Sequence, residues 1–167
     1  VGGSVPKEYI KAIGEGTEAA LKNGMVAGYE VVDIKATLFD GSYHDVDSSE
    51  MAYKIAASMA LKEAAKKCKP VILEPIIKIV VTVRTDDVGT ILSDLNTRRG
   101  KIMGMEANAA KDQEITALVP ESEILEYVND LKSLTQGSGF FNRKFYAYEE
   151  APAYMRDKII KENSLLN

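Results

Sequence analysis

The strongest constraint on the fold of this 167-residue chain is the order of strand-like and helix-like segments in its second half. Four segments are rich in β-branched or aromatic residues or alternate in hydrophobicity, and two repeat apolar side chains at helical spacing. They are a strand at 76–83, a helix at 88–95 stopped by Gly100, strands at 101–108 and 113–119, a helix opened by Pro120, and a strand at about 139–148. The order βαββαβ predicts a ferredoxin-like α+β domain, with two helices on one face of an antiparallel sheet.

The spacing of apolar residues also predicts which side chains of the last two segments are buried. The helix after Pro120 has one apolar face, made of Ile124, Val128, Leu131 and Leu134. Strict alternation in the last strand predicts two aromatic faces, one with Phe141 and Phe145 and the other with Phe140, Tyr146 and Tyr148.

The first half of the chain holds two helix-like segments joined by a strand-like one. Pro6 favours the start of a helix that ends at 23–24, and residues 30–39 alternate in hydrophobicity, which predicts a half-buried strand. Asp47 followed by Glu50 approximates a capping box and predicts the start of the second helix. These elements indicate a second, smaller α+β unit.

Two prolines mark a boundary between these halves. Pro70 and Pro75 bracket a segment that neither a helix nor a central strand would tolerate. We therefore expect one domain at 1–69, a second at 70–152 and a helical tail at 153–167.

Composition limits the partners that the chain attracts. Its 21 lysines and arginines against 25 aspartates and glutamates give a net charge of −4, so any contact with nucleic acid must be local. No apolar run approaches the roughly 20 residues needed to cross a bilayer, and no leader opens the chain, so we expect a cytoplasmic protein without a membrane partner. Cys68 is the only cysteine, which fits a reducing compartment.

The loop at 40–47 is dense in turn-forming residues and carries the only histidine, His44. Together with Asp45, Asp47 and Glu50 this histidine could hold a divalent cation, but a carboxylate-rich loop that caps a helix is the more common case, so we predict no metal site. With a single histidine, no serine or cysteine has a catalytic partner at motif spacing, and we predict no catalytic residue. No G-x-x-x-x-G-K-[ST] motif occurs, so this chain is not expected to bind or hydrolyse GTP and needs no cofactor.

Two groups of basic residues each allow two interpretations. The second helix closes on Lys62, Lys66, Lys67 and Lys69, which compensate the helix dipole or form a phosphate-binding patch. Arg98 and Arg99 stand at another helix end, where they cap the helix or contact a phosphate. The sheet itself lacks the aromatics with which RNA-recognition motifs stack bases, because 76–83 and 113–119 contain none.

Three groups of residues resemble elongation factor G. They are GGSVPKEY at 2–9; AGY at 27–29 with TLFDGSYHDVDSSEMA at 37–52 and KIAASMA at 54–60; and LEPI at 73–76, DLN at 94–96, RRG at 98–100, VP at 119–120, LTQG at 134–137 and EAP at 150–152. The resemblance covers essentially the whole chain, which opens on Val1 and is read as a fragment of a longer protein.

The resemblance implies that 1–69 is the later part of domain IV, a partial unit like domain 2 of ribosomal protein S5, and that 70–152 is the ferredoxin-like domain V. Gly41, Ser42, Tyr43, His44 and Asp45 would form the tip loop that contacts RNA at the decoding centre during translocation of tRNA and mRNA. Domain V would face the stalk base and sarcin-ricin region of the large subunit, which makes Arg98 and Arg99 candidates for contact with ribosomal RNA. GTP and magnesium would be bound by the parent factor. Because earlier strands of domain IV are absent, we expect a mobile or self-associating first unit.

The sequence allows three alternatives to a translocation factor. Ser138-Gly139 and Asn142-Arg143-Lys144 depart from the family pattern, which allows a divergent paralogue acting in ribosome recycling. A ferredoxin-like domain could also be a ligand-sensing module. An acylphosphatase is disfavoured, because the loop at 84–87 places two carboxylates where an anion would sit.

Overall fold

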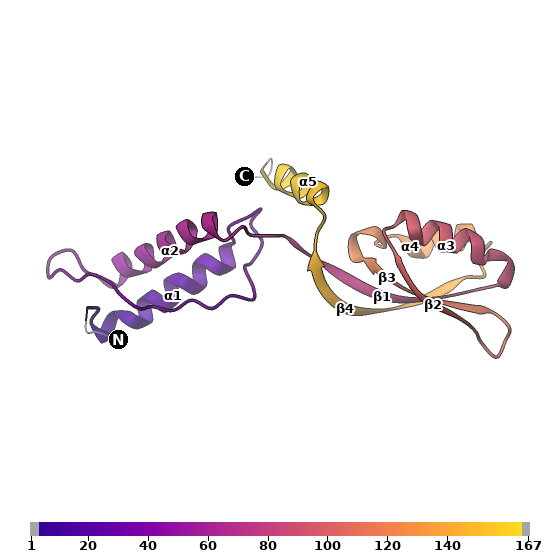
Figure 1. Ribbon diagram of the computed structural model, residues 1–167, viewed down its shortest axis with the longest axis horizontal. Coiled ribbons are helices and arrows are strands. Elements are labelled where there is room, and N and C mark those ends of the chain that lie inside the picture. The colour runs from indigo at the N-terminus through magenta and orange to yellow at the C-terminus, as the bar shows by residue number, and fades with distance from the viewer. Residues whose placement is uncertain (1–3, 165–167) are drawn as a thin grey trace. The chain divides into compact units, whose positions relative to one another are not determined.

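The computed structural model describes residues 4–164, and it combines helices with an antiparallel sheet, which confirms the α+β class. The described chain divides into two compact units (Figure 1). Leu73–Ala151 form the second unit, whereas the residues up to Ile72 and those from Pro152 onward form the first.

The second unit has the predicted βαββαβ order. Its elements are β1 (Leu73–Val83), α3 (Val88–Thr97), β2 (Lys101–Ala107), β3 (Gln113–Pro120), α4 (Tyr127–Leu134) and β4 (Phe140–Glu150), with short 3-10 turns at Thr85–Asp87 and Glu121–Glu123. The strands pair antiparallel in the spatial order β2-β3-β1-β4. This is the ferredoxin-like sheet that the sequence predicted.

Helices α3 and α4 lie together over one face of this sheet (Figure 1). Alternate residues of β1 and β3 point to that face, because successive side chains of a strand point to opposite sides. The core between helices and sheet consists of Ile77, Ile79, Val81, Val83, Ile91, Leu95, Ile115, Ala117, Val119, Ile124, Tyr127 and Leu131. The opposite face of the sheet has no helix of this unit over it (Figure 1).

Two details of this unit differ from the prediction. Pro120 ends β3 and does not open a helix, and a 3-10 turn separates it from α4. Ile124 lies in that connection and not in the helix, so the helical positions that face the core cannot be counted from it. Tyr127 is fully buried, and Val128, predicted to be inward, is 57 % exposed.

The second difference is a bulge in β4. Ile76 pairs with Ala147 but Ile77 pairs with Phe145, which leaves Tyr146 as the extra residue. The bulge breaks the alternation, so the predicted separation of Phe145 from Tyr148 is wrong: their ring centroids lie 5.3 Å apart.

The first unit is built on two packed helices, α1 (Lys7–Asn23) and α2 (Glu50–Lys67). The residues of α1 that are buried are small and four residues apart, namely Ala12, Gly16 and Ala20. A Cβ atom added to Gly16 would lie 2.5 Å from the backbone oxygen of Lys54, so the two helices approach closely at this glycine. The Nζ atom of Lys54 also lies 2.6 Å from a carboxylate oxygen of Glu15.

Helix α2 begins later than predicted. Its N-cap is Ser49, whose hydroxyl oxygen accepts a hydrogen bond of 3.1 Å from the backbone N–H of Ala52. The predicted cap at Asp47 is therefore wrong. Ser49 lies immediately before the first helical residue, where its oxygen reaches an N–H group of the first turn that has no partner within the helix.

The strand predicted at 30–39 is not formed. The described residues 30–39 contain no paired strand, and Val32 and Ile34 are 52 % and 48 % exposed. A strand needs a neighbour for its backbone hydrogen bonds, and the described part of this unit supplies no other strand. Apolar side chains of α2 are exposed as well, with Met51 at 65 %; self-association of this unit stays a prediction.

The C-terminal tail is helical, as predicted for 153–167. Helix α5 spans Ala153–Ser164, and the last three residues of the predicted tail lie outside the described range. The side-chain amide of Asn163 donates a hydrogen bond of 2.8 Å to the carbonyl oxygen of Ala27. Among the described residues, no helix is long and apolar enough to span a membrane.

Candidate functional site

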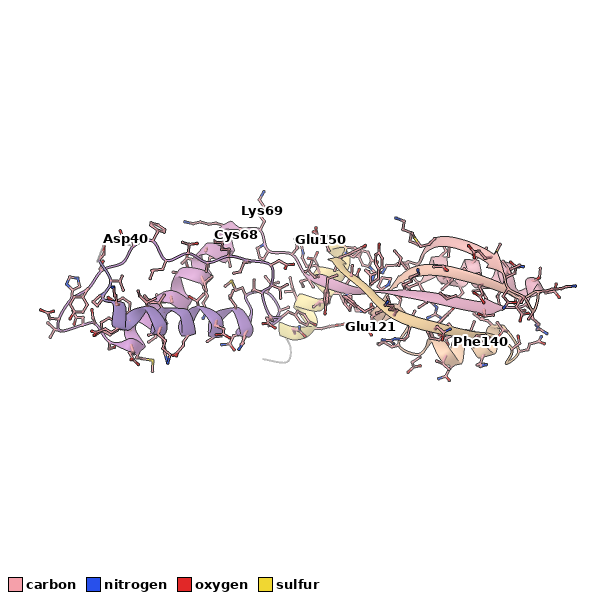
Figure 2. All side chains as sticks on the ribbon, turned by 90° about the horizontal axis from the view of Figure 1, so that it is seen from below. Asp40, Cys68, Lys69, Glu121, Phe140 and Glu150 are labelled. Carbon is pink, nitrogen blue, oxygen red and sulfur yellow. The ribbon has the colours of Figure 1, made fainter. Side chains whose placement is uncertain are left out.

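The loop predicted as the functional site lies between the extended segment at 30–39 and α2. In Figure 1 it projects past the N-terminal end of α2, and Figure 2 labels Asp40 at its beginning. All five predicted site residues, Gly41, Ser42, Tyr43, His44 and Asp45, are exposed. The structure therefore brings them together on one accessible loop, which we call the tip loop.

The backbone of His44 is fixed by a local turn. Its N–H donates to the Ser48 hydroxyl oxygen at 2.9 Å, and its carbonyl oxygen accepts from the N–H groups of Asp47 and Ser48 at 3.3 and 3.1 Å. The side chain of His44 is exposed. A fixed backbone with an exposed imidazole suits a residue that contacts a partner.

A tyrosine cluster supports the base of the tip loop. The hydroxyl of Tyr53, on α2, donates a hydrogen bond of 2.8 Å to the carbonyl oxygen of Ser42. The ring of Tyr53 stacks on that of Tyr9, on α1, with centroids 4.8 Å apart, and Tyr9 lies 6.2 Å from the ring of Tyr43. Both helices therefore hold the loop. Sequence reasoning missed Tyr53, and its only signal was a tyrosine one turn into the helix that follows the loop.

The electrostatics of the tip loop do not favour phosphate. The tip loop contains the acidic Asp45 and is flanked by Asp40 and Asp47. The Asp45 carboxylate beside the phenol raises the pKa of Tyr43, and burial together with Glu8 raises the pKa of Tyr9. Both phenols are therefore neutral hydrogen-bond donors near neutral pH. The loop is equipped for stacking and hydrogen bonding rather than for neutralising an anion.

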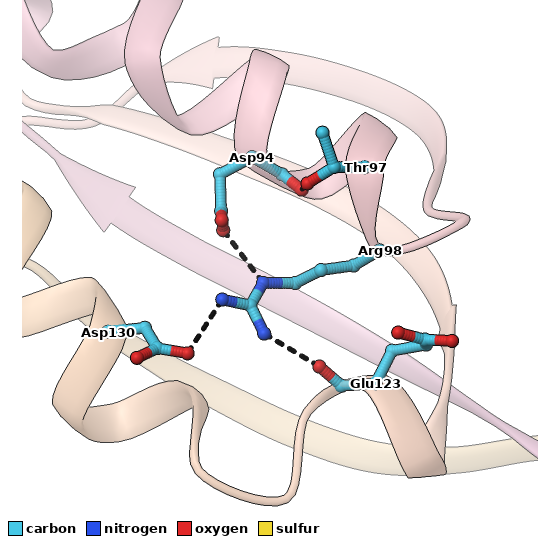
Figure 3. Close-up of polar contacts among 5 residues, drawn as sticks. All are labelled: Asp94, Thr97, Arg98, Glu123 and Asp130. Atoms are coloured by element: carbon cyan, nitrogen blue, oxygen red, sulfur yellow. Dashed lines mark hydrogen bonds and ion pairs between the residues drawn. The ribbon is translucent and has the colours of Figure 1, made fainter.

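Arg98 lies in the second unit, and its guanidinium group joins three elements of that unit (Figure 3). Its nitrogens donate to an Asp94 carboxylate oxygen at 2.9 Å, to the Glu123 carbonyl oxygen at 2.8 Å and to an Asp130 carboxylate oxygen at 2.7 Å. The guanidinium carbon also lies 4.8 Å from the centroid of the buried Tyr127 ring. Burial opposes this charge, but the hydrogen bonds to Asp94 and Asp130 outweigh it and raise the pKa of Arg98.

Arg99 is held by internal partners as well. Two of its nitrogens donate to the two carboxylate oxygens of Glu74, at 2.9 and 2.6 Å, and a third donates to Glu123 at 3.2 Å. The side chains of Arg98 and Arg99 are 18 % and 20 % exposed. Both arginines thus connect parts of the domain, and their contact with ribosomal RNA stays a prediction.

Two further predictions concern the lysines at the end of α2 and a metal site. Lys66 pairs with Glu63 at 2.5 Å, and Lys66 and Lys67 occupy the last turn of α2, where they complement the helix dipole. Among the described residues, no group of three or more histidine, cysteine, aspartate or glutamate side chains is arranged to hold a metal ion.

Comparison with known proteins decides the family. Residues 1–69 match the family "Elongation factor G, domain IV", and residues 71–159 match "Elongation factor G C-terminus". The chain belongs to the elongation factor G family. Neither match is to the domain that hydrolyses GTP. The first unit is accordingly of the S5-like type and the second of the ferredoxin-like type, as the resemblance implied.

A solved structure supports this assignment. A protein of Thermus thermophilus, known from a crystal structure, is 42 % identical and superposes with a TM-score of 0.85 over 99 % of this chain. The chain spans 25 % of the length of that protein. The similarity thus extends across both units of this elongation factor G segment.

Proposed function

We propose that this segment is the ribosome-facing part of an elongation factor that promotes translocation of tRNA and mRNA, and that its tip loop contacts RNA at the decoding centre. The observation that carries the proposal is the exposed His44, held by a local turn and by the tyrosine cluster beneath the loop. Membership of the elongation factor G family supports a role in translation.

The chemistry available to the loop is recognition rather than catalysis. An imidazole stacks on a base or donates a hydrogen bond to a phosphate oxygen, and one base stack contributes about 1–3 kcal/mol. The acidic flanks of His44 make a purely electrostatic attraction to RNA unfavourable. A rigid loop that occupies the vacated site would oppose backward movement of the RNAs, and this needs no bond-making at His44.

The proposal is tested by replacing His44 with alanine in the full-length factor. Single-round translocation, followed with fluorescent mRNA, is expected to slow about tenfold, because a stack of about 1–3 kcal/mol is lost from the step. GTP hydrolysis is expected to stay within about twofold, since neither matched region hydrolyses GTP. Lys111→Ala, in the exposed β2–β3 turn, is the matched control.

Equal translocation rates for the His44→Ala and parent proteins would contradict the proposal. The same proteins, mixed with post-termination ribosomes, test a role in recycling: ribosome splitting without translocation would assign the protein to a recycling paralogue. In either case we propose that the protein acts in the cytoplasm with the ribosome as its partner. GTP and magnesium would be bound by a domain of the parent factor outside this segment.

A further inference from the structure

Strand pairing aligns three lysines across the whole sheet of the second unit. Leu118 of β3 pairs with Lys101 of β2 on one side and with Lys78 of β1 on the other, and Lys78 pairs with Lys144 of β4. These residues are far apart in sequence. We call Lys101, Lys78 and Lys144 the lysine row.

The lysine row lies on the face of the sheet that α3 and α4 do not cover. Ile77 and Ile79, on either side of Lys78, are buried in the core beneath the helices, so Lys78 points the other way. All three lysines are exposed. Since neighbouring strands lie about 4.8 Å apart, the row spans three intervals, or about 14 Å.

The lysine row is not neutralised within the part of the chain that the structure describes. Among residues 4–164, no carboxylate lies within salt-bridge distance of the three amino groups, whereas Arg98, Arg99 and Arg143 each pair with an aspartate or glutamate. Lys78 and Lys144 are directly opposed on adjacent strands, and like charges in such a pair destabilise a sheet.

The next row on this face carries no charge. It contains Thr116, Val80 and Asn142, paired across β3, β1 and β4. None of these residues, nor Leu118, is an exposed large apolar side chain. The row beyond it pairs Thr82 with Glu114 and with Phe140 of the edge strand β4, and the Phe140 side chain is 53 % exposed. Protein interfaces depend on clustered aromatic or aliphatic anchors, whereas contacts to an RNA backbone use lysine, threonine and asparagine, which are the polar residues of the lysine row and of the row next to it.

We propose that the lysine row binds the phosphate backbone of RNA. This inference rests on the proposed ribosomal role and deepens it, because it assigns the RNA contact of this domain to the open sheet face instead of to Arg98 and Arg99. Those arginines would have to break their hydrogen bonds to acceptor oxygens within the domain to reach a phosphate, whereas the lysine row is already accessible.

The test measures binding of the 167-residue chain to a fluorescent single-stranded RNA of about 20 nucleotides, by anisotropy over a series of potassium chloride concentrations. Three phosphate contacts predict a slope of about −2 in a plot of log K against log salt, at about 0.7 per contact for a single strand. Lys78→Gln combined with Lys144→Gln is expected to bring that slope to about −0.7 and to weaken binding about tenfold at low salt. Lys111→Gln, outside the row, is the control and should leave both values unchanged.

Circular dichroism melts establish that each variant is folded. An unchanged slope in the double variant would overturn the proposal, and so would displacement of the RNA by an equal concentration of polyglutamate, which would indicate an acidic protein partner. The assay contains no ribosome, and it is run in the His44→Ala background so that base stacking by the tip loop does not contribute to the measured binding. Failure here therefore leaves the proposed function of the tip loop standing, and failure of the translocation test leaves this result standing.

Discussion

The hydroxyl of Tyr53 donates a hydrogen bond of 2.8 Å to the carbonyl oxygen of Ser42, and thereby joins helix α2 to the tip loop across eleven residues of chain. The donor is 9 % exposed and its ring stacks on Tyr9. The position of the tip loop therefore depends on a side chain outside the loop.

We expect Tyr53→Phe to loosen the tip loop without unfolding the unit. The variant keeps the ring stack and loses one hydrogen bond, which contributes about 0.5–1.5 kcal/mol. Amide exchange at residues 41–45 should become several-fold faster, while exchange in the middle of α1 stays unchanged. Unaltered exchange at 41–45 would show that the bond does not hold the loop.

Gly16 and Gly14 offer a matched pair on α1. A Cβ at Gly16 meets the Lys54 backbone at 2.5 Å, so Gly16→Ala should force the helices apart and destabilise the first unit by about 1–3 kcal/mol. At Gly14 nothing lies within 4 Å of an added Cβ, so Gly14→Ala should stabilise α1 by about 0.5–1 kcal/mol. Urea unfolding, monitored by amide exchange in α1, measures the change in unfolding free energy for both variants. If both changes had the same sign, the close approach of α1 and α2 at Gly16 would be contradicted.

Arg98→Lys keeps the positive charge but removes the branched guanidinium group, and so tests which of the two stabilises the second unit. Lysine cannot reach Asp94, Asp130 and the Glu123 carbonyl oxygen at once, so the variant should lose about 1–3 kcal/mol of unfolding free energy. Arg84→Lys is the control, because the Arg84 side chain is half exposed and its pair with Asp87 contributes little. Equal urea midpoints for the two variants would argue against the structural role of Arg98.

The Glu15–Lys54 pair predicts a pH dependence of the first unit. A hydrogen bond from Lys54, followed by the attraction of its charge, lowers the pKa of Glu15 from the usual value of 4.5. A depressed carboxylate pKa stabilises the fold above the unfolded pKa, and this stabilisation is lost as the pH falls through the lower folded pKa. Glu15→Gln should therefore melt at a lower temperature than the parent near neutral pH, and the difference should vanish in acid, below the folded pKa. A difference that persists in acid would exclude the ion pair as its cause.

Much of the fold followed from local patterns. The β-branched run at 76–83 and the helical spacing after it were sufficient for the βαββαβ order, since each element depends on residues close in sequence. The exposure of His44 was equally predictable, because turn-forming residues surround it. By contrast, the alternation at 30–39 suggested a strand that is not formed, because a strand depends on a neighbour that its own residues do not supply.

The sequence by itself determined the α+β class, the resemblance to elongation factor G and the location of the tip loop. Tertiary structure alone decided that Tyr53 supports that loop, that Arg98 and Arg99 pair internally, and that Lys78, Lys101 and Lys144 share one row. The physical reason is the sequence separation of the residues that interact. Periodicity and turn chemistry act within a few residues, whereas strand register and helix packing join side chains that are tens of residues apart.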